Sequence, residues 1–273
     1  DVLLVDNKFK TTCEIAIGDN LLSLPWVKDL VRVNKAFIVE RALGMREMLK
    51  ASKRLSDYMH FAIKEKKENI WIAQREGRAK DSDDRTQKGI LQMMSMGGEG
   101  SIAERLKQLH LVPLSISYEY DPCDFLKARE YQLKRDVEGW KKGPTDDLVS
   151  MQTGIFGYKG HVHYHAALCL DEYLDTLDPE MSKSDIYNKV AAHIDHEIHA
   201  NYRLYPGNYV ALDLLEGNTS HTDHYTPEDK GKFERYVAGQ LAKIDLPNKD
   251  EAYLKERILT MYANPVRNYL AAQ

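Results

Sequence analysis

The sequence predicts an α/β fold: a mixed, largely parallel sheet flanked by helices, followed by a helical C-terminal region. Three observations support this prediction. Apolar runs alternate with helical patterns through the first half of the chain, and these runs are almost continuously apolar, as is typical of strands covered on both faces. Beyond about residue 180, apolar residues recur mostly at helical spacing. We therefore expect one domain over 1–273, with an α/β core in 1–135 and a helical region in 180–273.

The individual elements follow from periodicity and from the positions of glycine, proline and charged residues. The clearest is a long amphipathic helix over 42–67, in which apolar residues recur at spacings of three and four and lysines occupy the last turn. Core packing is its expected role, although its methionines also suit the wall of an acyl groove. In chain order the expected elements are a strand at 36–39, this helix, a strand at 69–74, helices from 87 and over 101–108, a strand at 109–122, helices to 140 and 156, a strand at 160–168, and helices over 183–204, 209–215, 227–244 and 250–270.

The overall composition argues against several classes of protein. A formal net charge of −4 and an isoelectric point near 6.2 do not suit a nucleic-acid partner, since general nucleic-acid binders need an excess of Lys and Arg to neutralise phosphates. Any anion site is therefore expected to be local. No stretch approaches the ~20 apolar residues that span a bilayer, so we expect any membrane contact to be peripheral. The three cysteines, Cys13, Cys123 and Cys169, lack CxxC spacing and fit a reducing cytosol.

A charged loop follows the predicted strand at 69–74 and forms the first candidate site. Arg and Lys side chains donate hydrogen bonds suited to phosphate oxygens, and a glycine lets the backbone approach an anion closely. Ligands of α/β sheets gather at the loops after the carboxyl ends of the strands, which is where this loop lies. As an isolated feature, however, the cluster is more typical of a solvated loop. Its members are Arg75, Glu76, Gly77, Arg78, Lys80 and Arg85.

Six of the ten histidines fall between residues 161 and 199 and form a second candidate site. Three of them alternate along a predicted strand and so share one face, and three repeat every third residue along a predicted helix. Imidazoles on one face can converge on zinc, which leaves a metal-dependent hydrolase as an alternative function. The spacing in HEIH is nevertheless one residue short of HExxH, so we expect no metal there. The two groups are His161, His163 and His165, and His193, His196 and His199.

Three short motifs in a fixed order resemble those of a known enzyme superfamily. FIVER at 37–41, EGRAK at 76–80 and LVPLSISYE at 111–119 are similar to the second, third and fourth sequence blocks of the glycerolipid acyltransferases. That superfamily acylates glycerol 3-phosphate and 1-acylglycerol 3-phosphate. Each motif alone is modest, but three in this order are considerably more specific. The resemblance covers residues 1–135 well and the helical remainder loosely.

The resemblance implies an O-acyltransferase of phospholipid biosynthesis. Such an enzyme moves a fatty acyl group from a coenzyme A or acyl-carrier-protein thioester, as co-substrate, to the hydroxyl of a glycerol phosphate or lysophospholipid acceptor. It needs no other cofactor, and it works in the cytoplasm at the inner face of the cell membrane. By the same resemblance, the acceptor's phosphate is held by Arg41, Glu76, Gly77 and Arg78, with Lys80 next and Arg75 and Arg85 as outer members.

One part of the family pattern is missing from the sequence. The catalytic signature is a histidine, four residues and an aspartate upstream of the block at 37–41, and no such pair precedes Arg41. The match from His224 to Asp229 lies where the family has no catalytic motif, and we expect it to be coincidental. The catalytic residues are thus unknown: we expect either that the motif lies before Asp1, or that the chain is a non-catalytic lipid-binding module. In both cases residues 1–273 should not turn over substrate.

Overall fold

The computed structural model describes residues 12–18, 29, 33, 35–39, 44–77, 79–143 and 145–273, and its internal contacts divide the chain into two compact units. Each unit contains its own hydrophobic core. The chain passes from one unit to the other several times, and one long helix, α9 (Lys183–Ala200), contributes to both. Unit 1 comprises 1–77, 85–112 and 168–194, and unit 2 comprises 78–84, 113–167 and 195–273.

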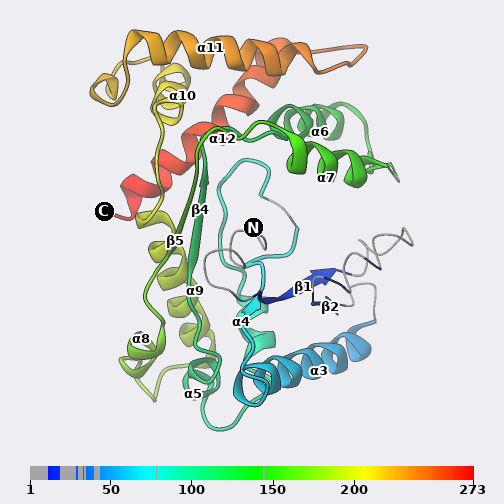
Figure 1. Cartoon of the computed structure of the whole chain (residues 1–273), viewed down its shortest axis with the longest axis vertical. Helices are drawn as coiled ribbons and strands as arrows, with labels where there is room; N and C mark the ends of the chain where they lie inside the picture. The colour runs from blue at the N-terminus through cyan, green and yellow to red at the C-terminus, as the bar shows by residue number, and fades with distance from the viewer. Residues whose placement is uncertain are drawn as a thin grey trace. The chain divides into compact units, whose positions relative to one another are not determined.

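Unit 1 is built on a small parallel sheet (Figure 1). The central strand β1 (Glu14–Gly18) pairs in parallel with β2 (Ala36–Val39) on one side and with β3 (Ile70–Trp71) on the other. Parallel strands need a crossover connection, and α3 (Met45–Lys64) connects β2 to β3, which lie on opposite sides of β1. The parallel sheet and its flanking helices confirm the expected α/β class, whereas β1 is not among the expected strands.

The amphipathic helix expected over 42–67 is observed as α3. Its buried side includes Met59, at 2% exposure, while the opposite side is charged and exposed. Glu14 of β1 is also buried, and its carboxylate accepts hydrogen bonds from Tyr58 Oη at 2.6 Å and from Lys66 Nζ. A buried carboxylate needs such donors, so these contacts stabilise α3 against the sheet.

Short helices complete unit 1 around a core of aliphatic side chains. The helix α5 begins at a capping box, in which the Ser101 hydroxyl accepts from Glu104 N while the Glu104 carboxylate accepts from Ser101 N. The helices are α4 (Lys88–Met94), α5 (Ile102–Lys107), α8 (Asp171–Asp175) and the first part of α9. The most deeply buried core residues include Leu91, Leu106, Leu170 and Val190.

Unit 2 contains an antiparallel pair of strands, which corrects the expectation of a single mixed sheet. β4 (Leu114–Tyr118) pairs with β5 (Val162–Ala166), and among the described residues neither strand pairs with the parallel sheet. The reason lies in the polar side chains of β4. The buried Ser115 Oγ donates to Ile198 O near the end of α9, and Ser117 Oγ accepts from Arg203 N.

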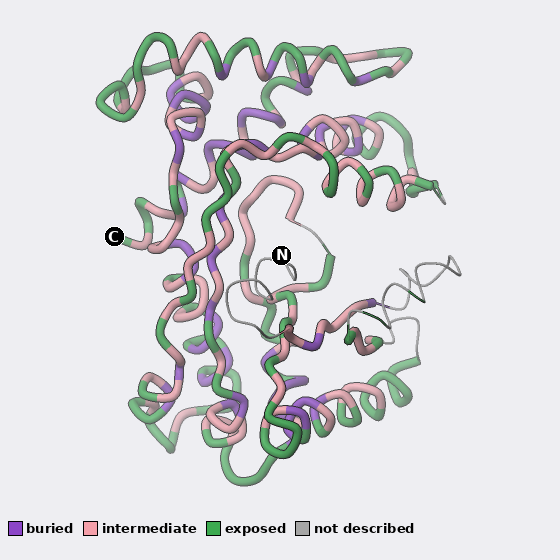
Figure 2. The backbone as a smooth tube through the Cα atoms, viewed as in Figure 1, coloured by how far each residue is buried: buried purple, intermediate pink, exposed green. Residues whose placement is uncertain are grey.

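The helices of unit 2 confirm the expected helical C-terminal region. They are α6 (Asp124–Asp136), α7 (Asp146–Phe156), the last turns of α9, α10 (Pro206–Glu216), the short 3-10 helix η2 (Thr222–His224), α11 (Pro227–Ala242) and α12 (Glu251–Ala271). Figure 2 shows buried residues in α10 and along α12, and these two helices supply most of the core of this unit. Among the described helices, none combines the length and the apolar character needed to cross a bilayer.

Candidate functional site

The candidate site is a pocket of about 540 Å³ in unit 1, at the carboxyl ends of the parallel strands. Gly18 ends β1, Val39 ends β2, and Ile72 and Ala73 follow β3, and all four line the pocket. Ligands of parallel sheets bind at this edge, because the connecting loops diverge there and leave a crevice. The location agrees with the sequence prediction for the loop after 69–74.

Two helices supply the apolar wall of the pocket. Met48 and Leu55 project from α3, and Ile90 and Met93 project from α4. On α3 these residues are seven positions apart, which places them on one face of the helix. Of the methionines of this helix, Met59 packs in the core, Met48 lines the pocket, and Met45 is exposed.

Polar residues form another part of the lining. Arg54 comes from α3, and Arg75 and Glu76 come from the charged loop. The base of this loop is closed by Gln87, whose Oε1 accepts from Glu76 N at 2.8 Å and whose backbone N donates to Gln74 O at 2.9 Å. The pocket therefore combines guanidinium groups with an apolar wall, which suits an amphipathic ligand with an anionic head.

Gly77 follows Glu76 in a left-handed conformation with φ of +74°, which favours glycine over any residue with a side chain. A Cβ added there would meet no atom within 4 Å. Backbone conformation, rather than crowding, therefore explains a glycine at this position. The open space beside it is compatible with the expected approach of an anion.

Of the other predicted site residues that the structure describes, Gly77, Lys80 and Arg85 do not line the pocket. Lys80 belongs to unit 2, where its ammonium pairs with Glu130; burial alone would raise the pKa of Glu130, but hydrogen bonds from Lys80 and Lys134 lower it. Arg85 is exposed in unit 1 and does not line the pocket. Arg41 and Arg78 lie outside the described residues.

Sequence reasoning missed Arg54. Its signal is its position, because Arg54 directly precedes Leu55 in the apolar stripe that runs from Met48 along α3. An arginine at the border of an apolar stripe extends its guanidinium group beyond the apolar surface. The charge then lies at the rim of any cavity that the stripe lines.

None of the ten histidines lines the pocket, and all ten are described. His193 of α9 stacks on Tyr173 with 3.7 Å between ring centroids, while His199, six residues later, is buried with Nε2 3.0 Å from Asp84 O. These contacts account for both rings without a metal. The pair His224 and Asp229 is also structural, since His224 stacks on Tyr209 and the Asp229 carboxylate accepts from the backbone N of Thr226 at the start of α11.

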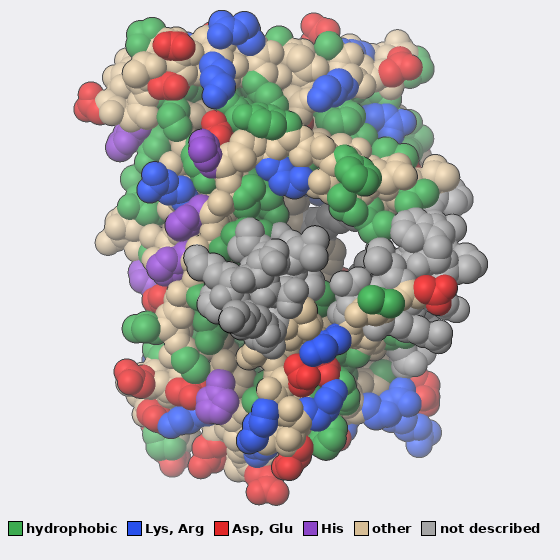
Figure 3. Space-filling view, viewed as in Figure 1, with side chains coloured by type: hydrophobic (Ala, Val, Ile, Leu, Met, Phe, Trp, Pro, Cys, Tyr) green, Lys and Arg blue, Asp and Glu red, His purple; other side chains and the backbone are tan. Residues whose placement is uncertain are grey.

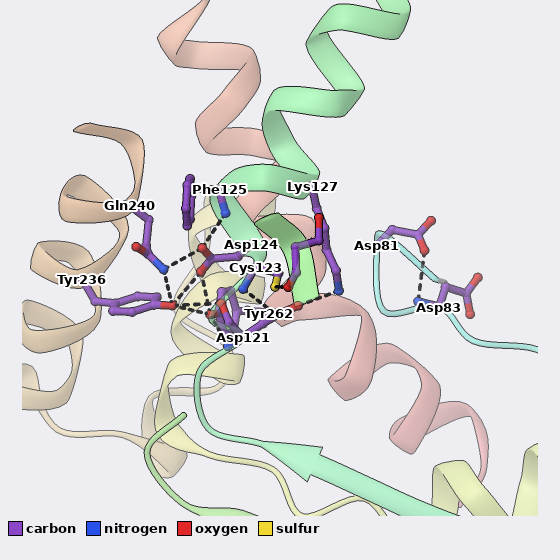
Figure 4. Close-up of polar contacts among 11 residues, drawn as sticks. Asp81, Asp83, Asp121, Cys123, Asp124, Phe125, Lys127, Tyr236, Gln240 and Tyr262 are labelled. Atoms are coloured by element: carbon purple, nitrogen blue, oxygen red, sulfur yellow. Dashed lines mark hydrogen bonds and ion pairs between the residues drawn. The ribbon is translucent and has the colours of Figure 1, made fainter. Parts of the chain in front are cut away.

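Unit 2 has a polar network of its own, centred on the buried Asp124 (Figure 4). One carboxylate oxygen accepts from Phe125 N and Gln240 Nε2, and the other accepts from the hydroxyls of Tyr236 and Tyr262. Burial raises the pKa of Asp124 to about 6 in spite of these hydrogen bonds. Because its donors come from α6, α11 and α12, the carboxylate connects three helices.

A second cavity, of about 380 Å³, lies beside this network in unit 2. Its lining includes Tyr262, Arg203 and the pair formed by Lys127 and Asp121, whose atoms are 2.6 Å apart. Arg203 and Lys127 are thus accompanied in this lining by carboxylates, since Asp84 and Asp121 also line the cavity. On the visible face of the molecule, acidic and basic side chains are interspersed (Figure 3).

In comparisons with known proteins, no family model, curated protein or solved structure matches the chain.

Proposed function

We propose that this chain is an acyltransferase of the glycerolipid type, whose pocket in unit 1 holds the acyl chain and the anionic head of a glycerol phosphate or lysophospholipid. One observation supports the proposal above the others. Two of the motifs that resemble the superfamily, at 37–41 and 76–80, are separated in sequence by the whole of α3, yet Phe37, Val39 and Glu76 line the same pocket. Motifs that contribute to one function are expected to meet in this way.

The lining suits the two parts of such an acceptor. The apolar side chains of α3 and α4 match a fatty acyl chain, and the guanidinium groups of Arg54 and Arg75 match phosphate oxygens. In the reaction, the acceptor hydroxyl oxygen forms a bond to the thioester carbonyl carbon, the carbon–sulfur bond breaks, and the thiol leaves with the proton. Holding the phosphate fixes the hydroxyl relative to the thioester, and positioning of this kind lowers the barrier. The acyl transfer would take place in the cytoplasm, at a membrane surface.

The proton transfer needs a general base, which in the superfamily is a histidine. No histidine of residues 1–273 lines the pocket. The pocket therefore supports the binding part of the proposal more strongly than the chemical step. The histidine-based hydrolase remains without a specific observation in its favour, because the rings of His193 and His199 make the structural contacts described above.

Binding of lysophosphatidic acid, compared with a monoacylglycerol of the same chain length, tests the proposal. Each lipid is titrated below its own critical micelle concentration. Calorimetry should show that the protein binds lysophosphatidic acid more tightly than the monoacylglycerol. Arg54→Gln should weaken lysophosphatidic acid binding about tenfold, as expected for the loss of one charge-assisted hydrogen bond of about 1.4 kcal/mol. The same change should leave monoacylglycerol binding unaltered.

Arg46→Gln is the matched control, because Arg46 lies exposed on the same helix but does not line the pocket. Equal effects of both substitutions would indicate a general loss of positive charge on α3 and would contradict the assigned pocket. Absence of binding by the unaltered chain would contradict the proposal as a whole.

A further inference from the structure

A second group of side chains in unit 1 has the composition of a metal site. His110, Cys169 and Asp171 each offer one ligand atom, and these nitrogen, sulfur and oxygen atoms all lie within 4.8 Å of one another. The group shares no residue with the pocket lining or with the two histidine groups noted in the sequence. We propose that it binds a divalent transition-metal ion of the zinc class.

The backbone around these residues is anchored on both sides. Cys169 and Asp171 flank Leu170, which is only 1% exposed, and Leu170 N donates to Leu111 O at 2.9 Å. His110 likewise lies between Leu109, at 4% exposure, and Leu111. Buried leucines therefore fix the two segments, so the three ligand atoms converge without the need to order a mobile loop.

His110 adopts a left-handed backbone conformation, which is uncommon for residues other than glycine. It follows the end of α5 with φ of +48°, a left-handed position that glycine most often occupies after a helix. In this conformation the imidazole Nδ1 lies 2.6 Å from Asp171 Oδ2. Glycine would adopt this conformation without strain, but it has no imidazole to bond to Asp171.

One oxygen of Asp171 points independently to a missing partner. Asp171 Oδ1 is buried and accepts no hydrogen bond from the described residues. A buried carboxylate oxygen without a donor is costly, and a bound cation would satisfy it. The nearby Lys107 does not fill this role, because its ammonium bonds to Asp175, one turn further along α8.

The ligand types select the class of ion. Thiolate, imidazole and carboxylate together suit zinc or cobalt, and three protein ligands leave a fourth position open to water or another ligand. Ligand atoms around zinc are about 3.5 Å apart, so the His110 ring must move away from Asp171 by about 1 Å. Its side chain is 64% exposed, which allows this movement. Metal binding converts the Cys169 thiol to a thiolate and releases its proton to solvent.

Titration of the purified, untagged chain with Co²⁺ under reducing conditions tests the site. A thiolate bound to Co²⁺ gives an intense charge-transfer absorption in the near ultraviolet, and we expect this band to saturate at one ion per chain and to disappear on addition of Zn²⁺. Cys169→Ser should abolish the band, whereas Cys13→Ser and Cys123→Ser should retain it. Asp171→Asn should weaken cobalt binding roughly tenfold or more, since even the loss of a group outside the ligand shell has such an effect.

Circular dichroism of each variant shows whether the fold is retained. If Cys169→Ser does not fold, His110→Gln serves as the second variant, and it should weaken cobalt binding without loss of the fold because the His110 side chain is exposed. No charge-transfer band in the unaltered chain, or a band that survives in Cys169→Ser, would overturn the proposal and leave His110 and Asp171 as an ordinary ion pair.

Discussion

Asp124 is a single buried residue on which the packing of three helices depends. It accepts hydrogen bonds from its own helix α6, from Tyr236 and Gln240 of α11, and from Tyr262 of α12 (Figure 4). These donors stabilise the ionised carboxylate, but the loss of hydration on burial is the larger effect and raises its pKa to about 6. The charge state of this one group therefore changes the stability of unit 2 in mildly acidic solution.

We predict that Asp124 makes the folded state less stable as the pH rises from about 4 to about 6. Because the pKa is higher in the folded state than in the unfolded chain, the folded state holds the proton more tightly. The contribution to stability is fully present below the ordinary Asp value of about 3.9 and is lost as the pH rises through about 6, by up to ~3 kcal/mol. Urea unfolding at several pH values should show this fall, and Asp124→Asn, which carries no charge, should remove it.

Asp223→Asn is the control for this experiment, because Asp223 is an exposed aspartate of the same unit. Its pH profile should follow that of the unaltered protein. If the fall in stability persists in Asp124→Asn, another group titrates in this range and the role given to Asp124 is wrong.

At the scale of one element, α11 begins at a reciprocal cap that the sequence TPED encodes. Thr226 Oγ1 accepts from Asp229 N at 3.1 Å, and the Asp229 carboxylate accepts from Thr226 N at 2.9 Å. We predict that Thr226→Ala lowers the free energy of unfolding by about 1 kcal/mol, because it leaves a backbone donor of the first turn without its partner. The shift of the urea midpoint at unchanged slope measures this loss.

Thr226→Ser keeps the hydroxyl and should restore most of the stability. Thr222→Ala, in the preceding 3-10 helix, removes an exposed hydroxyl that bonds only to Thr219 O, and should have little effect. A similar loss in both alanine variants would show that the cap at Thr226 contributes nothing specific.

The helices could be predicted from sequence because their signals are local. Apolar spacing, caps and prolines define α3 and α9 to α12 within each segment, independently of the rest of the chain. Strand pairing depends on partners far away in sequence. The apolar run around β4 reads as a strand of the main sheet, yet Ser115 bonds to the end of α9 and β4 pairs with β5 instead.

The helix α4 offers a test of the acyl-binding wall. Gly89 lines the pocket, and a Cβ at this position would meet no atom within 4 Å. We predict that Gly89→Leu fills part of the pocket and weakens the binding of monoacylglycerol and lysophosphatidic acid alike. The new side chain takes the place of several methylenes of the lipid, and each buried methylene contributes about 0.8 kcal/mol to binding. The expected loss of affinity is therefore tenfold or more. Calorimetric titration of both lipids measures the change.

Gly239→Leu is matched to Gly89→Leu, because Gly239 also lies in a helix with room for a Cβ but belongs to α11 of unit 2. Both substitutions should raise helix propensity by up to about 1 kcal/mol. Only Gly89→Leu should affect lipid binding. Equal affinity of the two variants would show that the lipid does not occupy the space beside α4.

At the scale of the whole molecule, the sequence predicted the place of the charged loop after a strand, but not which residues line the pocket beside it. The loop after β3 lies at the expected edge of the sheet, because the chemistry of its residues and their place after a strand are both readable in sequence. Lys80 follows in the same loop but pairs with Glu130 of α6, a long-range contact that sequence order does not reveal. Arg54 lines the pocket from α3, but its place in the site could not be predicted because any amphipathic helix carries such exposed cations.

The pocket has a lining suited to lipid binding but contains no histidine, and this gives a prediction for the unaltered polypeptide of residues 1–273. We expect this polypeptide to bind lysophosphatidic acid but to transfer no acyl group to it, because none of its histidines lines the pocket to remove the hydroxyl proton. Incubation with a radiolabelled acyl thioester and the acceptor, followed by separation of the lipids, measures transfer directly. A general base contributes about 10²- to 10⁴-fold, so the expected rate lies at or near the uncatalysed background. If substantial transfer is observed and Glu76→Gln abolishes it, Glu76 is the base, since its side chain lines the pocket. This result would contradict the need for a histidine.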